Sequence, residues 1–149
     1  MVKPVIKKIT VNCTPARAFD IFVKETSSWW PLDKHAVSAM DGAAAKSVTI
    51  EPRLDGEIFE ISPEGQRISW GRVTAFSEGE SIAMTWHPGG DPAKPTEVSV
   101  SFEASGESKT NVTLVHSNWG NLGDTAEQTR NGYDSGWVFV FETCYANAI

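Results

Sequence analysis

The sequence predicts an α+β fold in which a curved antiparallel sheet of about seven strands closes around one long C-terminal helix. Two observations point to this class. Short runs of alternating apolar and polar residues, separated by turn residues, fill the middle of the chain, and an apolar face with helical spacing occupies its end. Because 149 residues suffice to bury one ordinary core, we expect a single domain over residues 1–149.

The N-terminal third predicts one strand and two short helices. Residues 5–11 alternate, which indicates a strand that ends near Cys13. A helix is expected directly afterwards, since Thr14 can cap its free N–H groups and Pro15 suits its first position. Residues 27–31 indicate a second helical turn that stops at a proline. Residues 33–46 have no periodicity, so we expect a mobile connection there.

Residues 46–117 predict an antiparallel meander of short strands. The clearest alternation places Val98, Val100 and Phe102 on the inner face of their strand. The other long strands are expected to present these inner faces: Ile68, Trp70, Arg72, Thr74 and Phe76 on one, Ile82, Met84 and Trp86 on the next, and Val112, Leu114 and His116 on the last.

The final helix is expected to start at Asp124, which with Glu127 has the spacing of a capping box. Gly132 and Gly136 are costly inside a helix, so we expect either a later start or a close approach to another backbone. One apolar face covers an arc of about 100°. It consists of Tyr133, Trp137, Val140, Phe141, Cys144 and Ala148.

Composition argues against several classes of function. The net charge of −6, without a basic patch, disfavours a nucleic-acid partner. No apolar run approaches the roughly 20 residues of a spanning helix, and no signal or transit pattern opens the chain, so we expect a cytoplasmic protein without a membrane partner. Cys13 and Cys144 lie far apart without clustered His, and no phosphate loop is present, so we expect neither a metal nor a cofactor.

Six Trp and seven Phe are more large rings than a core of this size needs for packing alone. We therefore expect a cavity between the sheet and the final helix that binds a small hydrophobic or amphipathic molecule. Arg72 or His116 would orient an oxygen of that ligand, because a buried Arg needs an anionic partner. The expected lining residues are Trp70, Arg72, Trp86, His116, Trp119, Tyr133, Trp137 and Phe141.

Two sets of titratable residues leave their roles open. His116 is either a general base or ligand-orienting donor, or a structural histidine, and we favour the structural role. Glu51, Glu57 and Glu60 either place a carboxylate pair in the cavity or belong to the solvated face, which we favour. Alternation does not decide which of the three carboxylates points inward. No established catalytic motif is present, so the sequence indicates no defined reaction.

A set of ordered motifs resembles the START-like (SRPBCC) superfamily, in the branch named for the activator of the heat-shock-protein-90 ATPase. The resemblance implies a helix-grip fold and three functions: hydrophobic-ligand binding, which we favour, a co-chaperone-like interaction domain, or an enzyme of the cyclase, dehydratase or hydrolase type. A chaperone partner and a homodimer are both open. The motifs are Pro15–Phe19, Trp29-Trp30-Pro31, Glu51–Glu57, Trp70–Val73, Thr85-Trp86, Val112–Ser117, Trp119 and Gly136-Trp137.

Overall fold

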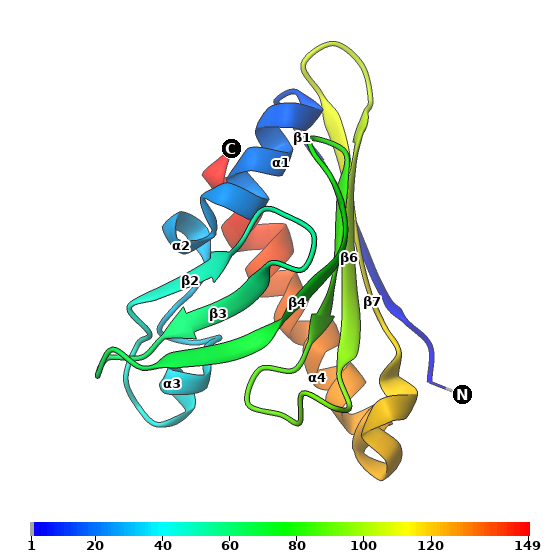
Figure 1. Cartoon of the computed structure of the whole chain (residues 1–149). Helices are drawn as coiled ribbons and strands as arrows, with labels where there is room; N and C mark the ends of the chain where they lie inside the picture. Colours follow the sequence, from blue (N-terminus) through cyan, green and yellow to red (C-terminus); the bar gives the residue numbers. More distant parts are fainter. Residues whose placement is uncertain (1) are drawn as a thin grey trace.

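The computed structural model describes residues 2–149 and contains one curved, seven-stranded antiparallel sheet. Its strand order is β1-β7-β6-β5-β4-β3-β2, and the C-terminal helix lies in its concave side (Figure 1). The predicted fold class is therefore confirmed. The strands are β1 (Val5–Val11), β2 (Ser47–Ile50), β3 (Glu57–Ile61), β4 (Arg67–Ser77), β5 (Ser81–Trp86), β6 (Thr96–Ala104) and β7 (Thr110–Ser117).

The helices fall into an N-terminal group and a C-terminal group. The first comprises α1 (Pro15–Lys24), α2 (Thr26–Trp29) and α3 (Val37–Met40). The second begins with the 3-10 segment η1 (Trp119–Thr125), which is kinked at Gly123. The helix then continues through α4 (Ala126–Trp137), the π-helix η2 (Val138–Tyr145) and the terminal turn η3 (Ala146–Ala148). None of these helices, within residues 2–149, has the length and apolar character needed to cross a membrane.

The start of α1 forms as its sequence predicts. The Thr14 hydroxyl accepts a hydrogen bond from the Arg17 backbone N–H at 3.3 Å, and Pro15 occupies the first turn. The other end of the chain packs on this helix, because the Tyr145 hydroxyl donates a 2.7 Å hydrogen bond to the carbonyl of Ala18. Figure 1 shows the C-terminus beside α1, so the first and last helices close the same end of the sheet.

Strand β4 departs from simple alternation at two places. Opposite β3, Ile58 pairs with Gly71 and Phe59 pairs with Ser69, so Trp70 is an extra residue. Opposite β5, a second register shift lies between Val73 and Ala75. Each shift moves the following side chains to the other face. Arg72 and Thr74, expected to face inward, are therefore exposed, and Val73 is buried instead. The inner faces predicted for β5, β6 and β7 are confirmed.

The final helix also differs from its prediction. Asp124 lies in η1, and α4 begins at Ala126 with no side-chain cap, so the predicted capping box does not form. Downstream, the change from α to π winding rotates the helix surface, because a π-turn holds more residues. As a result Tyr145 is fully buried, whereas Cys144, expected on the apolar face, is half-buried.

The connection expected to be mobile contains α3 and is fixed by side-chain contacts. The backbone N–H groups of Val37 and Ser38 both donate to the Glu60 carboxylate on β3, at 2.7 and 3.0 Å. The Trp30 indole N–H donates to the carbonyl of His35 at 2.7 Å. The lack of periodicity in residues 33–46 does not mean mobility, because these tertiary contacts order a segment that has no repeating pattern of its own.

Candidate ligand-binding site

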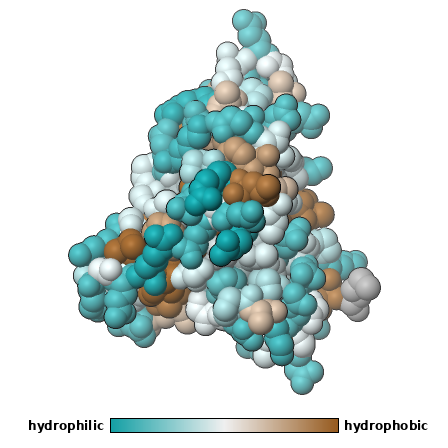
Figure 2. All heavy atoms as spheres, viewed as in Figure 1, coloured by the Kyte–Doolittle hydropathy of each residue, from teal (hydrophilic) through white to brown (hydrophobic). Residues whose placement is uncertain are grey.

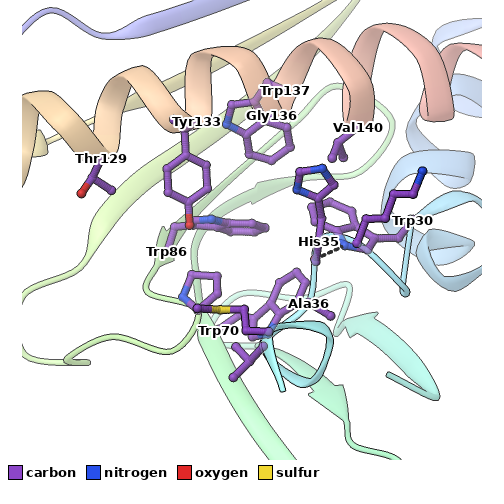
Figure 3. Close-up of a pocket in the computed structure, with 15 residues that line it drawn as sticks. Trp30, His35, Ala36, Trp70, Trp86, Thr129, Tyr133, Gly136, Trp137 and Val140 are labelled. Carbon is purple, nitrogen blue, oxygen red and sulfur yellow. Dashed lines mark hydrogen bonds between the residues drawn. The ribbon is translucent and has the colours of Figure 1, made fainter. Parts of the chain in front are cut away.

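A pocket of about 370 Å³ lies between the concave face of the sheet and the C-terminal helix. The α3 segment borders it on one side and α4 on the other (Figure 3). Its volume is within the usual range for small-molecule sites. The lining residues are Trp30, Lys34, His35, Ala36, Val37, Met40, Trp70, Trp86, Pro88, Thr129, Gly132, Tyr133, Gly136, Trp137 and Val140.

Four tryptophans from four different elements form the aromatic wall of this pocket. Trp30 follows α2, Trp70 lies on β4, Trp86 ends β5 and Trp137 ends α4. Neighbouring rings have centroids 5.2 to 6.0 Å apart and are tilted or edge-on to one another, which is the favoured geometry for aromatic pairs. The wall is therefore a rigid, apolar surface suited to a flat ligand.

Strand β4 runs very close to β5 beside Trp70, the extra residue opposite β3. At Gly71, directly after it, a Cβ would lie 1.8 Å from the carbonyl oxygen of Thr85. Only glycine permits this approach of β5 to the irregular part of β4. The local geometry of the sheet beside Trp70 thus depends on one glycine.

Glu60 is a fully buried carboxylate behind the pocket wall. One oxygen accepts hydrogen bonds from Val37 N–H and, at 2.8 Å, from the Trp70 indole; the other accepts from the N–H and, at 2.6 Å, the hydroxyl of Ser38. Burial by itself would raise the pKa of Glu60, but the Ser38, Val37 and Trp70 donors outweigh it and hold that pKa below its usual value. The expectation that Glu60 lies on the solvated face is therefore wrong. Its carboxylate is not available as a general base either, because both oxygens already accept hydrogen bonds.

His116 is fully buried between Trp119, Trp137 and Thr96 and does not line the pocket. The Trp137 indole donates to its Nδ1 at 3.0 Å, and an indole can only donate, so the imidazole proton is on Nε2. That N–H points to the Thr96 hydroxyl at 2.7 Å, which in turn donates to the carbonyl of Trp86. Burial lowers the pKa of His116 to about 3. The favoured structural role is therefore the one this geometry supports, with Trp and Thr as partners.

Two polar groups face the pocket with unused hydrogen-bonding capacity. The Trp86 indole N–H is buried and has no partner within residues 2–149. The Tyr133 hydroxyl lies beside it without reaching hydrogen-bond geometry (Figure 3). Burial raises the pKa of Tyr133, and the adjacent Trp86 N–H partly offsets that rise. A small movement of Tyr133, or a ligand oxygen, would satisfy this buried donor.

Residues 12–143 match the model of the family described as activator of Hsp90 ATPase homolog 1-like protein. The chain belongs to this family. No curated protein matches this sequence. The predicted assignment to the START-like superfamily is confirmed.

Solved structures with the same fold include proteins of several kinds. An anthrahydroquino-γ-pyrone synthase, Txn09, is 25% identical with a TM-score of 0.66, over 99% of this chain and 97% of that one. CalC from Micromonospora echinospora, described as a self-sacrificing resistance protein, is 24% identical with a TM-score of 0.73, over 97% and 92%. The Aha1 dimer from Colwellia psychrerythraea is 14% identical with a TM-score of 0.62, over 97% of each chain.

Half of the residues expected at the site line the pocket. Trp70, Trp86, Tyr133 and Trp137 do so. The other four lie elsewhere: His116, Trp119 and Phe141 are buried in the core, and Arg72 is on the outer face, where it reaches the carbonyl of Asp55 at 3.5 Å. Within residues 2–149, no three His, Cys, Asp or Glu side chains converge as a metal site would require.

Sequence reasoning missed the α3 side of the pocket. His35 lines the cavity together with Ala36, Val37 and Met40, and none of these four residues was expected at the site. The available signal in the sequence was the Trp29-Trp30-Pro31 motif directly before this segment. Two adjacent large indoles indicate that the core extends to this point, and both are buried. Gly132 and Gly136 of α4, which are costly inside a helix, leave space open beside the pocket.

Proposed function

We propose that this protein binds a small, flat, largely apolar molecule in the pocket between α4 and the sheet. The observation that carries the proposal is the wall of four tryptophans around a cavity of about 370 Å³. A core that served stability alone would be filled to the density of an organic crystal. Here large rings from four elements surround open space, and such pockets are the usual sites of small ligands.

The polar groups of the pocket support an amphipathic ligand. The unpartnered Trp86 N–H and the Tyr133 hydroxyl offer hydrogen bonds at one part of the wall. Lys34 also lines the pocket and adds a positive charge at another part of the wall; its Nζ atom lies 5.2 Å from the centroid of the Phe139 ring. A ligand with an apolar ring body and oxygen atoms at its edge would match both features.

One of the related solved structures supports this proposal. Txn09, at 25% identity, is an anthrahydroquino-γ-pyrone synthase, so a protein of this fold is associated with the chemistry of a fused-ring molecule.

The surface offers less support for the co-chaperone alternative. Figure 2 shows hydrophobic side chains on one face as separate patches among hydrophilic ones. The large exposed apolar side chains lie on five different segments of the fold, namely β1, α3, the β2–β3 turn, η2 and the C-terminus: Ile6, Met40, Leu54, Val138 and Ile149. A partner-binding surface would be expected to gather such side chains into one contiguous area.

Binding is tested with a dye and with a variant that fills the pocket. The fluorescence of anilinonaphthalene sulfonate should rise in a saturable way with the wild-type protein. Gly132 borders the pocket, and a Cβ there meets no atom within 4 Å, so Gly132→Leu should fill the space and weaken binding at least several-fold. Gly120→Leu is the matched control, because Gly120 is equally open but lies on η1 away from the pocket.

Native mass spectrometry of freshly purified protein complements the dye. A co-purifying small molecule, present in the wild type and depleted in Gly132→Leu, would support the proposal. If the dye shows no saturable binding and no adduct is found, or if Gly132→Leu and Gly120→Leu behave alike, the pocket is not a ligand site and the interaction-domain function takes precedence.

A further inference from the structure

His35 is held in a fixed position at the pocket. Its backbone N–H donates to the carbonyl of Pro31 at 2.9 Å, and its own carbonyl accepts from the Trp30 indole at 2.7 Å. Figure 3 shows the imidazole pointing toward the C-terminal helix within the pocket. The ring lies against Gly136 of α4, where a Cβ would be in van der Waals contact with the His35 Cε1 atom at 3.6 Å. The side of the imidazole is supported by Phe139, with ring centroids 5.8 Å apart.

The imidazole of His35 is supported by packing but not by hydrogen bonds. Within residues 2–149, neither ring nitrogen has a hydrogen-bond partner, in contrast to both nitrogens of His116. A neutral imidazole has one nitrogen that donates and one that accepts. A half-buried, oriented side chain with both of these unused is suited to contacting a bound molecule.

The other polar side chains of the pocket are mainly hydrogen-bond donors, so an acceptor at His35 adds a capacity that they largely lack. Lys34 and Trp86 can only donate, and the hydroxyls of Thr129 and Tyr133 can donate or accept. Among residues 2–149, no Asp or Glu lines the pocket. The unprotonated nitrogen of His35 is therefore the strongest side-chain acceptor available to a hydroxyl group of a ligand.

The electrostatic surroundings keep this nitrogen free of a proton. Burial and, second, the positive charge of Lys34 hold the pKa of His35 below its usual 6.5, and Asp33 opposes them by a smaller amount. Across the pocket the titratable group on α4 is Tyr133, whose pKa is raised by burial, so it is uncharged as well. The imidazole is therefore neutral at pH 7, as an acceptor must be.

We propose that His35 contacts the ligand directly and accepts a hydrogen bond from a hydroxyl group on its ring body. The pocket would then prefer phenols and enols over the corresponding ethers, and His35 would be a specificity-determining residue. This inference rests on the proposed function, because it requires a ligand between the tryptophans and the helix.

The test compares β-naphthol with its methyl ether, which share one ring system and differ in the hydroxyl proton. Both dissociation constants are measured by NMR titration of the ¹⁵N-labelled protein. We expect β-naphthol to bind the wild type about 3- to 10-fold better, relative to the ratio found with His35→Leu, because one hydrogen bond contributes that much. His35→Gln, which keeps an acceptor oxygen, should retain part of the preference.

The outcomes separate this inference from the proposed function. If both naphthalenes bind and the ratio is the same in wild type and His35→Leu, His35 makes no such contact, while ligand binding stands. If neither binds the wild type, the proposed function fails and this inference fails with it.

A measurement on the wild type alone covers the case in which His35→Leu does not fold. The two ring nitrogens of His35 are followed by NMR at pH 7 while each naphthalene is added. β-Naphthol, but not its ether, should shift the resonance of the unprotonated nitrogen, because only the hydroxyl can donate to it. Equal responses to the two compounds would overturn the proposal.

Discussion

The indole N–H of Trp70 and the carboxylate of Glu60 are joined by a buried 2.8 Å hydrogen bond. The same carboxylate holds the first residues of α3, so one side chain connects the sheet wall of the pocket to the segment that borders its other side. A charged group inside the core is normally costly, but four donors compensate this one.

Glu60→Gln is expected to reduce the free energy of unfolding by about 2–4 kcal/mol, because an amide presents an NH₂ group to donors that need an acceptor. Urea denaturation measures the change. Glu57→Gln is the control: Glu57 is part-exposed and pairs with exposed Arg67, so its loss should cost less than about 1 kcal/mol. Similar small losses in both variants would mean that α3 is not held by Glu60.

Acid should destabilise the protein through His116. Its folded pKa, about 3, lies below the unfolded value of about 6.5, so protonation favours the unfolded state. The stabilising contribution is complete above pH 6.5 and is lost as the pH falls toward 3. About 2 kcal/mol should disappear between pH 7 and pH 5. Urea denaturation across this range checks the loss, and His116→Asn should show a flatter pH dependence than His87→Asn.

Two glycine-to-alanine changes should act in opposite directions. Gly71→Ala places a methyl group against the backbone of Thr85, so it should cost more than about 3 kcal/mol or prevent folding. Gly132→Ala meets no atom within 4 Å and lies inside α4, so it should gain about 0.5–1 kcal/mol. Thermal denaturation of the two variants measures both effects. Equal effects would show that β4 and β5 can separate at Gly71 without penalty.

Trp137→Ala should lower the unfolding free energy by about 3–5 kcal/mol, because this side chain is buried and its indole holds His116. Val138→Ala, one residue along and 45% exposed, should change it by less than about 0.5 kcal/mol. A loss below about 1 kcal/mol for Trp137→Ala would place this face of the helix in solvent and contradict the packing described above.

The parts of the fold that depend on repeating patterns could be predicted from the sequence. Alternation correctly assigned the inner faces of β5, β6 and β7, and the Thr14-Pro15 pair marked the start of α1. Arg72 was misplaced because an extra residue in a strand leaves no compositional trace, although Gly71 beside it is a sign of close backbone contact. Tyr145 was missed because a 3.6-residue period does not describe a π-helix.

The candidate site was predicted on the sheet and on α4 but not on α3. The tryptophans of β4, β5 and α4 lie on regular elements, whose spacing shows the side to which they point. His35 and its neighbours are held in place by two side chains. Glu60, on β3, is distant in sequence, and the Trp30 indole is oriented by its contacts in the folded core. Such positions follow from the assembled core and not from any local pattern.

The packing of the indoles has a spectroscopic consequence. Trp29 touches Trp30, Trp30 touches Trp70, Trp86 and Trp137, and Trp119 reaches this group through the ring of His116. All six tryptophans of the chain therefore form one connected chromophore system. Excitation absorbed by any of them passes among its neighbours before emission. A quencher seated beside one indole should thus darken the whole set, and replacing a single tryptophan should not isolate the signal of another.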